Sequence, residues 1–249
     1  MRTIIAANWK MFKTRAEALA TARDLSARLS QRPAHEREVV VFAPFTALSA
    51  AAEGFAGSSV ATGAQDVYPA AEGAFTGEIS PAMIQECGAS WVLAGHSERR
   101  HVIGESPAFV GQKTSFALAA GLSVMLCIGE TLEEREKGEL ENVLRSQLEA
   151  AVRNIDPAFC SSLAVAYEPV WAIGTGKVAS EDDIVDAHAM VRRLLSTILG
   201  SPAASLPILY GGSVKPGNAG PILALDNVNG LLVGGASLQA ESFDAIIHA

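Results

Sequence analysis

The chain has 249 residues, of which 49% are hydrophobic and 18% charged, and its formal net charge is −8. This acidic balance argues against a general nucleic-acid surface or an anionic-membrane surface, because both need clustered Lys and Arg. No stretch approaches the ~18 consecutive apolar residues of a membrane span, and we see no cleavable signal. Cys87, Cys127 and Cys160 are too few and too widely spaced for a disulfide framework or a cysteine zinc site, so we expect a cytoplasmic protein.

Strand-like and helix-like patterns alternate in the first part of the chain. Thr14 and Glu17 have the spacing of a capping box, which begins a helix. An alanine-rich helix is expected to end near Gly54, and Ser80-Pro81 begins another. The apolar stripe of the first helix consists of Ala18, Ala22, Leu25 and Leu29. Buried strands are predicted at 4–9, 39–43, 59–65 and 91–95.

Two segments between these elements stand out. The connection 66–79 contains glycines at 73 and 77 and is longer than most connections, which is typical of a loop with a function. The segment 96–100, His-Ser-Glu-Arg-Arg, follows the fourth strand and is interpreted as a helix start.

The alternation continues to the end of the chain. Thr131 and Ser180 each begin a capping box, and 242–248 can close as a helix. His188 lies on the apolar stripe of its helix and is interpreted as a histidine at the core edge. The helix after Thr131 carries the stripe Leu140, Val143, Leu144, Leu148, Val152 and Ile155. The remaining strands are predicted at 122–128, 162–167, 207–211 and 230–233.

Eight such strand and helix units predict an α/β fold. Apolar strands without clean alternation indicate a parallel sheet covered by helices, and this length fits a closed eight-stranded (β/α)8 barrel. A doubly wound open sheet is the alternative. Because no linker divides residues 1–249, we expect a single domain.

The segment 166–177, AYEPVWAIGTGK, sets Glu168 at the carboxyl end of a strand. Pro169 lacks an N–H and stops further sheet pairing there. The stiff residues 169–171 are followed by Gly174, Thr175 and Gly176, which are small and allow many backbone conformations. This pattern indicates a lid that moves on short hinges. An isolated Glu-Pro would more often be an ordinary turn with a solvated carboxylate.

In a parallel barrel all strand ends meet on one face, which would bring Asn8, Lys10, His96 and Glu168 together. A carboxylate can take a proton from carbon only if the resulting carbanion is stabilised, here by a cation and an imidazole. A helix start after His96 favours the neutral ring as a hydrogen-bond donor. The alternative interpretation of a single such His or Lys is that it makes a hydrogen bond that only supports the structure.

Paired glycines follow each of the last two strands. Gly211-Gly212 with Ser213, and Gly234-Gly235, suit a phosphate because bare backbone N–H groups can surround it. Tight turns also use such pairs. Glu98 is a possible partner for Lys10, while Cys127 is either a supporting residue or a small core filler.

Five segments, taken together and in this order, resemble the triosephosphate isomerase family. The resemblance implies a TIM barrel that interconverts dihydroxyacetone phosphate and D-glyceraldehyde 3-phosphate in glycolysis and gluconeogenesis, without cofactor or metal. Two positions depart from the family pattern: Ala7 replaces a frequent glycine and Phe12 a frequent polar residue. The segments are 8–11, 95–100, 166–177, 210–213 and 232–237.

The resemblance also implies residue roles. Glu168 would be the proton-transferring base, and Lys10, His96 and Asn8 would hold the enediolate oxygens. The loop 66–79 would enter a second subunit in a homodimer, where Thr76 would support that subunit's site. The phosphate donors would be Gly174, Ser213, Gly234 and Gly235.

Two other functions are compatible with some of these residues. A glycoside hydrolase on the same barrel would use Glu98 and Glu168 as its two carboxylates. It would leave the glycine pairs unexplained, and only 6% of residues are aromatic. A barrel that binds a phosphate ligand without turnover is the other alternative, and the combination of Glu168, Lys10 and His96 argues against it.

Overall fold

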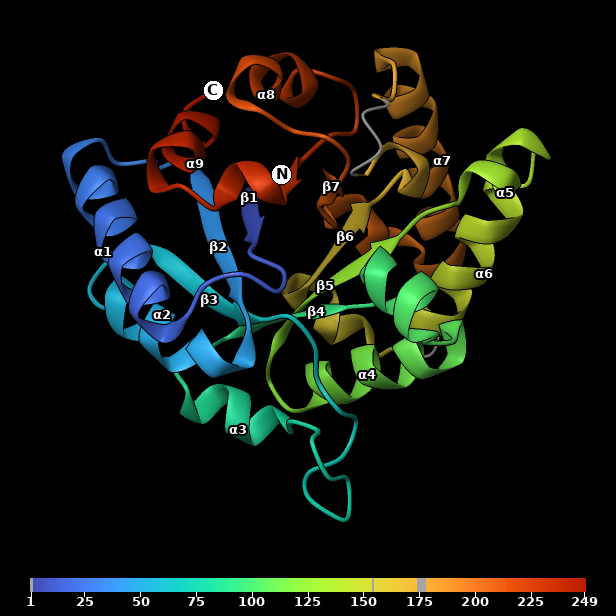
Figure 1. Ribbon diagram of the computed structural model, residues 1–249. Coiled ribbons are helices and arrows are strands. Elements are labelled where there is room, and N and C mark those ends of the chain that lie inside the picture. Colours follow the sequence, from blue (N-terminus) through green and yellow to red (C-terminus); the bar gives the residue numbers. More distant parts are fainter. Residues whose placement is uncertain (1, 154, 174–177) are drawn as a thin grey trace.

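The computed structural model describes residues 2–153, 155–173 and 178–249. All strands are parallel and pair in chain order, and β1 also pairs with β8, so the sheet closes into a barrel (Figure 1). The predicted (β/α)8 barrel is confirmed and the open-sheet alternative is wrong. The strands are β1 (Thr3–Asn8), β2 (Arg37–Ala43), β3 (Val60–Ala64), β4 (Trp91–Ala94), β5 (Ser123–Ile128), β6 (Leu163–Tyr167), β7 (Ile208–Tyr210) and β8 (Gly230–Val233).

Helices surround the barrel on its outside (Figure 1). None of the described helices is long and apolar enough to cross a membrane. A π-helix spans Arg99–Ile103, and short 3-10 helices include Val170–Ala172 and Gly235–Ser237. The α-helices are α1 (Arg15–Gln31), α2 (Leu48–Phe55), α3 (Pro81–Glu86), α4 (Pro107–Ala119), α5 (Leu132–Glu136), α6 (Leu140–Val152), α7 (Glu181–Leu199), α8 (Pro216–Leu223) and α9 (Ala240–Ile247).

The strands bury side chains on both faces, which explains why their sequences lack polar alternation. Ile4 and Ala6 of β1 belong to a cluster inside the barrel. Ile5 and Ala7 belong to a larger cluster between strands and helices. The barrel is therefore a filled core, and only its ends offer room for a site.

Local signals located most helix starts correctly. The side chain of Thr14 accepts from the Glu17 N–H, and Glu17 accepts in return, as a capping box requires. Capping boxes also begin α5 and α7, at Thr131 and Ser180. The buried residues of α1 are the four predicted ones, Ala18, Ala22, Leu25 and Leu29.

The single helix expected after Thr131 is wrong in detail, whereas the helix start expected after His96 is confirmed. The single helix expected after Thr131 is divided into α5 and α6, because Gly138 adopts a left-handed conformation with φ 72°. The helical turn that begins after His96 continues as a π-helix only to Ile103, where Gly104 ends it with φ 87°. The principal helix between β4 and β5 is α4, which begins at Pro107.

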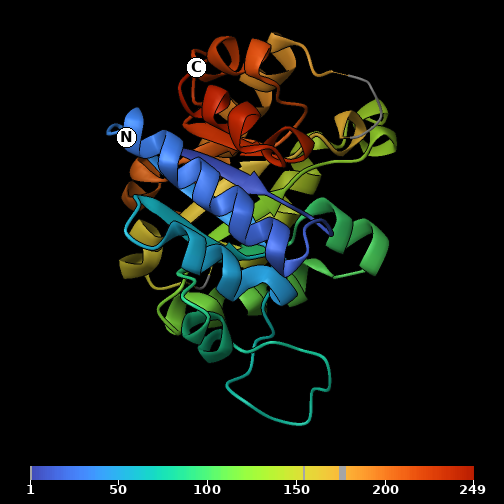
Figure 2. The same cartoon turned by 60° about the vertical axis from the view of Figure 1, so that its left-hand side comes forward.

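The long connection between β3 and α3 projects from the barrel body in both views (Figures 1 and 2). Residues 71–78 of this loop are exposed. Within the loop, Phe75 packs on Tyr68 with ring centroids 4.3 Å apart. Most of the loop thus extends into space instead of folding back on its own chain.

Candidate active site

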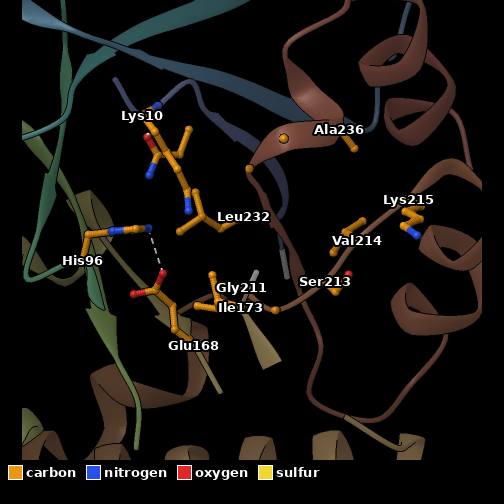
Figure 3. A pocket seen from close by; sticks show the side chains of 14 residues that line it. Lys10, His96, Glu168, Ile173, Gly211, Ser213, Val214, Lys215, Leu232 and Ala236 are labelled. Atoms are coloured by element: carbon orange, nitrogen blue, oxygen red, sulfur yellow. Dashed lines mark hydrogen bonds and ion pairs between the residues drawn. The ribbon is translucent and has the colours of Figure 1, made fainter. Parts of the chain in front are cut away.

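The carboxyl ends of the strands surround a cavity of about 420 Å³ (Figure 3). Most of the predicted site residues line it, although they come from distant parts of the sequence. The side chains of His96 and Glu168 face each other on one side, and the segment 213–215 lies across the cavity from them. The predicted residues that line it are Asn8, Lys10, His96, Glu168, Ser213, Gly234 and Gly235.

Glu168 is 2% exposed and follows the last residue of β6. Its Oε1 lies 3.0 Å from Nε2 of His96, and its Oε2 accepts the Ser97 backbone N–H at 2.9 Å. Burial disfavours the charged carboxylate, but His96, the Ser97 N–H and Lys10 outweigh this effect and lower the pKa of Glu168. The arrangement keeps Glu168 ionised and able to accept a proton.

His96 has different partners at its two ring nitrogens. Nδ1 accepts the Glu98 backbone N–H at 3.3 Å, so the neutral ring carries its proton on Nε2, toward Glu168. Burial opposes protonation of the ring, but the charge and hydrogen bond of Glu168 outweigh it and raise the pKa of His96. The expectation of a neutral ring rested on the helix start and did not include this carboxylate, which favours the protonated ring.

The backbone of Lys10 has an uncommon conformation, with φ 50°, and neighbouring residues hold it in place. Its N–H donates to Oδ1 of Asn8 at 2.9 Å, and its carbonyl accepts from Gln65 at 2.9 Å. Its Nζ lies 2.7 Å from Oε1 of Glu98, as predicted. The chain, acidic overall, thus places a cation and an imidazole in one cavity.

Glycine suits the two glycine pairs, Gly211-Gly212 and Gly234-Gly235, for different reasons. A Cβ at Gly211 would lie 2.9 Å from Cγ of Glu168, and one at Gly212 would lie 2.2 Å from the Tyr210 hydroxyl oxygen. A side chain at either position of the first pair would clash with its neighbours, so both positions require glycine. A Cβ at Gly235 would meet no atom within 4 Å, and Gly234 and Gly235 open the turn that continues to Ser237. The first N–H groups of such a turn have no partner within it and suit an anion.

Of the predicted residues that the structure describes, Glu98, Thr76 and Cys127 are not in this cavity lining. Thr76 is exposed on the projecting loop. Cys127 is fully buried among side chains inside the barrel. Burial, and then the charge of Glu168, raise the pKa of its thiol. Cys127 therefore fills the core inside the barrel. Gly174 lies outside the described residues.

Sequence reasoning missed the contacts that hold the start of the predicted lid. Oε1 of Glu130, a fully buried residue, accepts from the Tyr167 hydroxyl at 3.0 Å and from Nε1 of Trp171 at 2.8 Å. The same oxygen lies 3.3 Å from Arg135. Ser97 was also missed as a partner of Glu168, although it stands beside His96 in the sequence.

His188 does not line the cavity. It is fully buried on α7, its Nδ1 lies 3.1 Å from the Asn227 carbonyl oxygen, and its ring meets Tyr167 edge-on. The structural interpretation of this histidine is confirmed.

Comparison with known proteins gives a consistent result over the whole chain. The family model for triosephosphate isomerase matches residues 3–249. Triosephosphate isomerase of Nitratidesulfovibrio vulgaris (strain DSM 19637 / Miyazaki F) is 58% identical over 100% of both chains. That of Chloroflexus aurantiacus is 48% identical over 98% of each. The crystal structure of triosephosphate isomerase from Bartonella henselae has a TM-score of 0.89 and 39% identity, covering 100% of this chain and 99% of that one. The chain belongs to the triosephosphate isomerase family.

Proposed function

We propose that Glu168 is the base, and Lys10, His96 and Asn8 the electrophilic partners, in the reaction that family membership assigns to this chain. That reaction is the interconversion of dihydroxyacetone phosphate and D-glyceraldehyde 3-phosphate. The observation that carries the role of Glu168 is the cavity itself, where the carboxylate, Lys10 and His96 meet. Membership in an isomerase family argues against both a glycoside hydrolase and a barrel that only binds phosphate.

The chemistry needs a proton to leave one carbon of the substrate and arrive at its neighbour. Glu168 takes the proton from the first carbon and returns it to the second, passing through an enediolate. Lys10 supplies positive charge to the developing oxygen, and the Nε2 proton of His96 supplies a hydrogen bond. Before it can act, the carboxylate has to exchange its contact with the Ser97 N–H for one with the substrate.

The phosphate would lie on the other wall of the cavity. The support for this assignment is the open turn at Gly234 and Gly235, with Ser213 nearby in the same lining. Gly174 would add an N–H when the lid closes. Closure would exclude water, which strengthens each electrostatic contact and protects an enediolate that could otherwise lose its phosphate.

We also propose that the enzyme works as a homodimer in the cytoplasm, with no nucleic-acid or membrane partner. A second cavity, of about 330 Å³, adjoins the site and is lined by Lys10, Glu98, Met11 and Ile103. Met11 is 94% exposed and Ile103 is 64% exposed, which is unusual for large apolar side chains. The loop 66–79 of a second copy would fill this cavity and bring its Thr76 near Lys10.

The test is a coupled assay of glyceraldehyde 3-phosphate isomerisation with the wild type and Glu168→Gln. The amide keeps the shape of the side chain but cannot accept the proton, so we expect rapid wild-type turnover and an almost inactive variant. Wild-type turnover should persist after dialysis against a chelator. A folded wild type without turnover would overturn the proposed function, and an active Glu168→Gln would overturn the role of the base.

A further inference from the structure

Arg100 is a buried cation, 9% exposed, that lies behind the active site and not in it. Its Nε donates to the Gly95 carbonyl at 2.7 Å, and its Nη2 donates to the Cys127 carbonyl at 2.9 Å. The first carbonyl lies just beyond the end of β4 and the second lies near the end of β5. A single planar guanidinium thus joins the ends of two neighbouring strands.

Both strand ends lead directly to the reacting groups. His96 is the residue after Gly95, and Arg100 also donates its own backbone N–H to the His96 carbonyl at 3.1 Å. On the other side, the Glu168 N–H donates to the Ile128 carbonyl at 2.7 Å, so the backbone of Glu168 is fixed to the end of β5. The guanidinium therefore connects the backbone that carries His96 to the strand that holds Glu168.

The local backbone is adapted to this guanidinium. Gly95 has φ 70°, and a Cβ there would lie 2.6 Å from Nη2 of Arg100. The π-helix Arg99–Ile103 contains Arg100. Such helices are uncommon and frequently mark functional sites.

A purely structural reason for a buried arginine here is weak. Among the described residues, Nη1 of Arg100 is buried and has no hydrogen-bond partner. Burial lowers the pKa of Arg100, and the negative charge of Glu168 is among the influences that oppose this shift. A buried cation without a close ion pair costs stability, which a functional role would explain.

We propose that Arg100 is a positioning residue, which fixes the distance between His96 and Glu168 by holding the Gly95 and Cys127 carbonyls. This inference rests on the proposed roles of Glu168 and His96. The phosphate wall, at Gly234 and Gly235, receives no contact from the guanidinium. Arg100 should therefore influence turnover much more than substrate binding.

The experiment compares Arg100→Lys and Arg100→Ala with Arg192→Lys and Arg192→Ala. Arg192 is a suitable control because it also donates to backbone carbonyls, those of Ala203 and Leu206, and it does not line the active-site cavity. A misplacement of about 1 Å can cost ~100-fold in rate, so kcat of both Arg100 variants should fall by roughly 100-fold while KM stays within about threefold. Both Arg192 variants should keep kcat within about threefold.

Chemical rescue distinguishes a positioning role of Arg100 from a general loss of fold stability in its variants. Guanidinium ion at a concentration that leaves the wild type folded and active should raise kcat of Arg100→Ala at least fivefold and leave Arg192→Ala unchanged. If Arg100→Ala does not fold, the kinetics of Arg100→Lys test the positioning role instead. Lysine retains the charge but cannot reproduce the planar contact with two carbonyls. Wild-type kcat in Arg100→Lys, or equal losses in the Arg100 and Arg192 variants, would overturn the inference. An inactive wild type would instead overturn the proposed function.

Discussion

Oε1 of Glu168 lies 3.0 Å from Nε2 of His96, although the two residues follow different strands, β6 and β4. The contact joins a carboxylate to an imidazole whose other nitrogen already accepts a backbone hydrogen bond. It therefore fixes which nitrogen carries the proton in the neutral ring. The acid and base properties of each group depend on the other, and a change at either one should alter both.

Shortening the base should slow the reaction without weakening binding. Glu168→Asp withdraws the carboxylate by one methylene and leaves the phosphate wall intact, so we expect kcat to fall about 100-fold or more with KM nearly unchanged. Steady-state kinetics with both triose phosphates measure this. Equal turnover in the two proteins would contradict the assignment of the base.

Charge placed on the exposed apolar surface beside the second cavity should prevent dimer formation. Ile103 is 64% exposed, and Ile103→Asp would place a carboxylate where the loop of a second copy is proposed to bind. Sedimentation velocity should show a dimer for the wild type and a monomer of low activity for the variant. Leu132→Asp, at a 37% exposed residue on α5, is the control and should remain dimeric. A wild-type monomer with full activity would exclude the proposed assembly.

Removing Glu130 should destabilise the fold around Tyr167 and Trp171, where the proposed lid begins. Its Oε1 accepts from Tyr167 and Trp171, so Glu130→Ala would leave two donors without this acceptor, one of them on a fully buried side chain. A buried unsatisfied group costs about 1–3 kcal/mol, so the loss of the acceptor for Tyr167 should lower the free energy of unfolding by about 1–3 kcal/mol. Urea denaturation followed by circular dichroism measures the loss. Glu133→Ala, on the exposed face of α5, is the control and should be nearly neutral.

His188 should make the fold sensitive to mild acid. Burial, the largest influence, lowers its pKa from 6.5 to about 4. Above pH 6.5 the ring is neutral in the folded and unfolded chains. Between pH 6.5 and about 4 only the unfolded chain takes up the proton, so the free energy of unfolding falls, by about 3 kcal/mol in total at 1.36 kcal/mol per pKa unit.

Denaturation of the wild type and His188→Gln at pH 7 and pH 4.5 tests this effect. The variant will be less stable at pH 7 because the packing against Tyr167 and Tyr210 is lost. Its stability should nevertheless fall less than that of the wild type between the two pH values. His35→Gln, at an exposed histidine, should retain the wild-type dependence on pH. If stability depended on pH in the same way in all three proteins, a group other than His188 would cause the loss of stability in acid.

Sequence alone predicted those features of the fold that depend on neighbours along the chain. The capping box at Thr14 and the apolar stripe of α1 are set by local hydrogen bonds and helical periodicity, and both were located correctly. The break at Gly138 was missed because the capping box at Thr131 marks a helix start and the apolar stripe follows closely from Leu140, although α5 itself buries no side chain. A glycine can also be tolerated inside a helix, so its left-handed conformation was not evident.

The site was predictable where residues lie at a strand end or just after it, since a parallel barrel brings those ends together. Asn8, Lys10, His96 and Glu168 all satisfy this condition and all line one cavity. The contact of Glu130 with Tyr167 and that of Arg100 with Cys127 were not predictable, because these partners are distant in the sequence and only tertiary packing brings them together. The reason for Gly211 was also hidden, since the Glu168 side chain that excludes a Cβ there comes directly after the preceding strand, β6.

Closure of the sheet between β1 and β8 has a consequence for association between molecules. A closed barrel has no edge strand, so it offers no row of free backbone donors and acceptors to which another chain can add a strand. Contacts between copies must then be made by side chains, as we propose for Met11, Ile103 and the projecting loop. Recognition of this kind depends on matching shapes, whereas strand addition accepts almost any sequence. The same closure that shapes the active site thus protects the folded protein from indiscriminate aggregation.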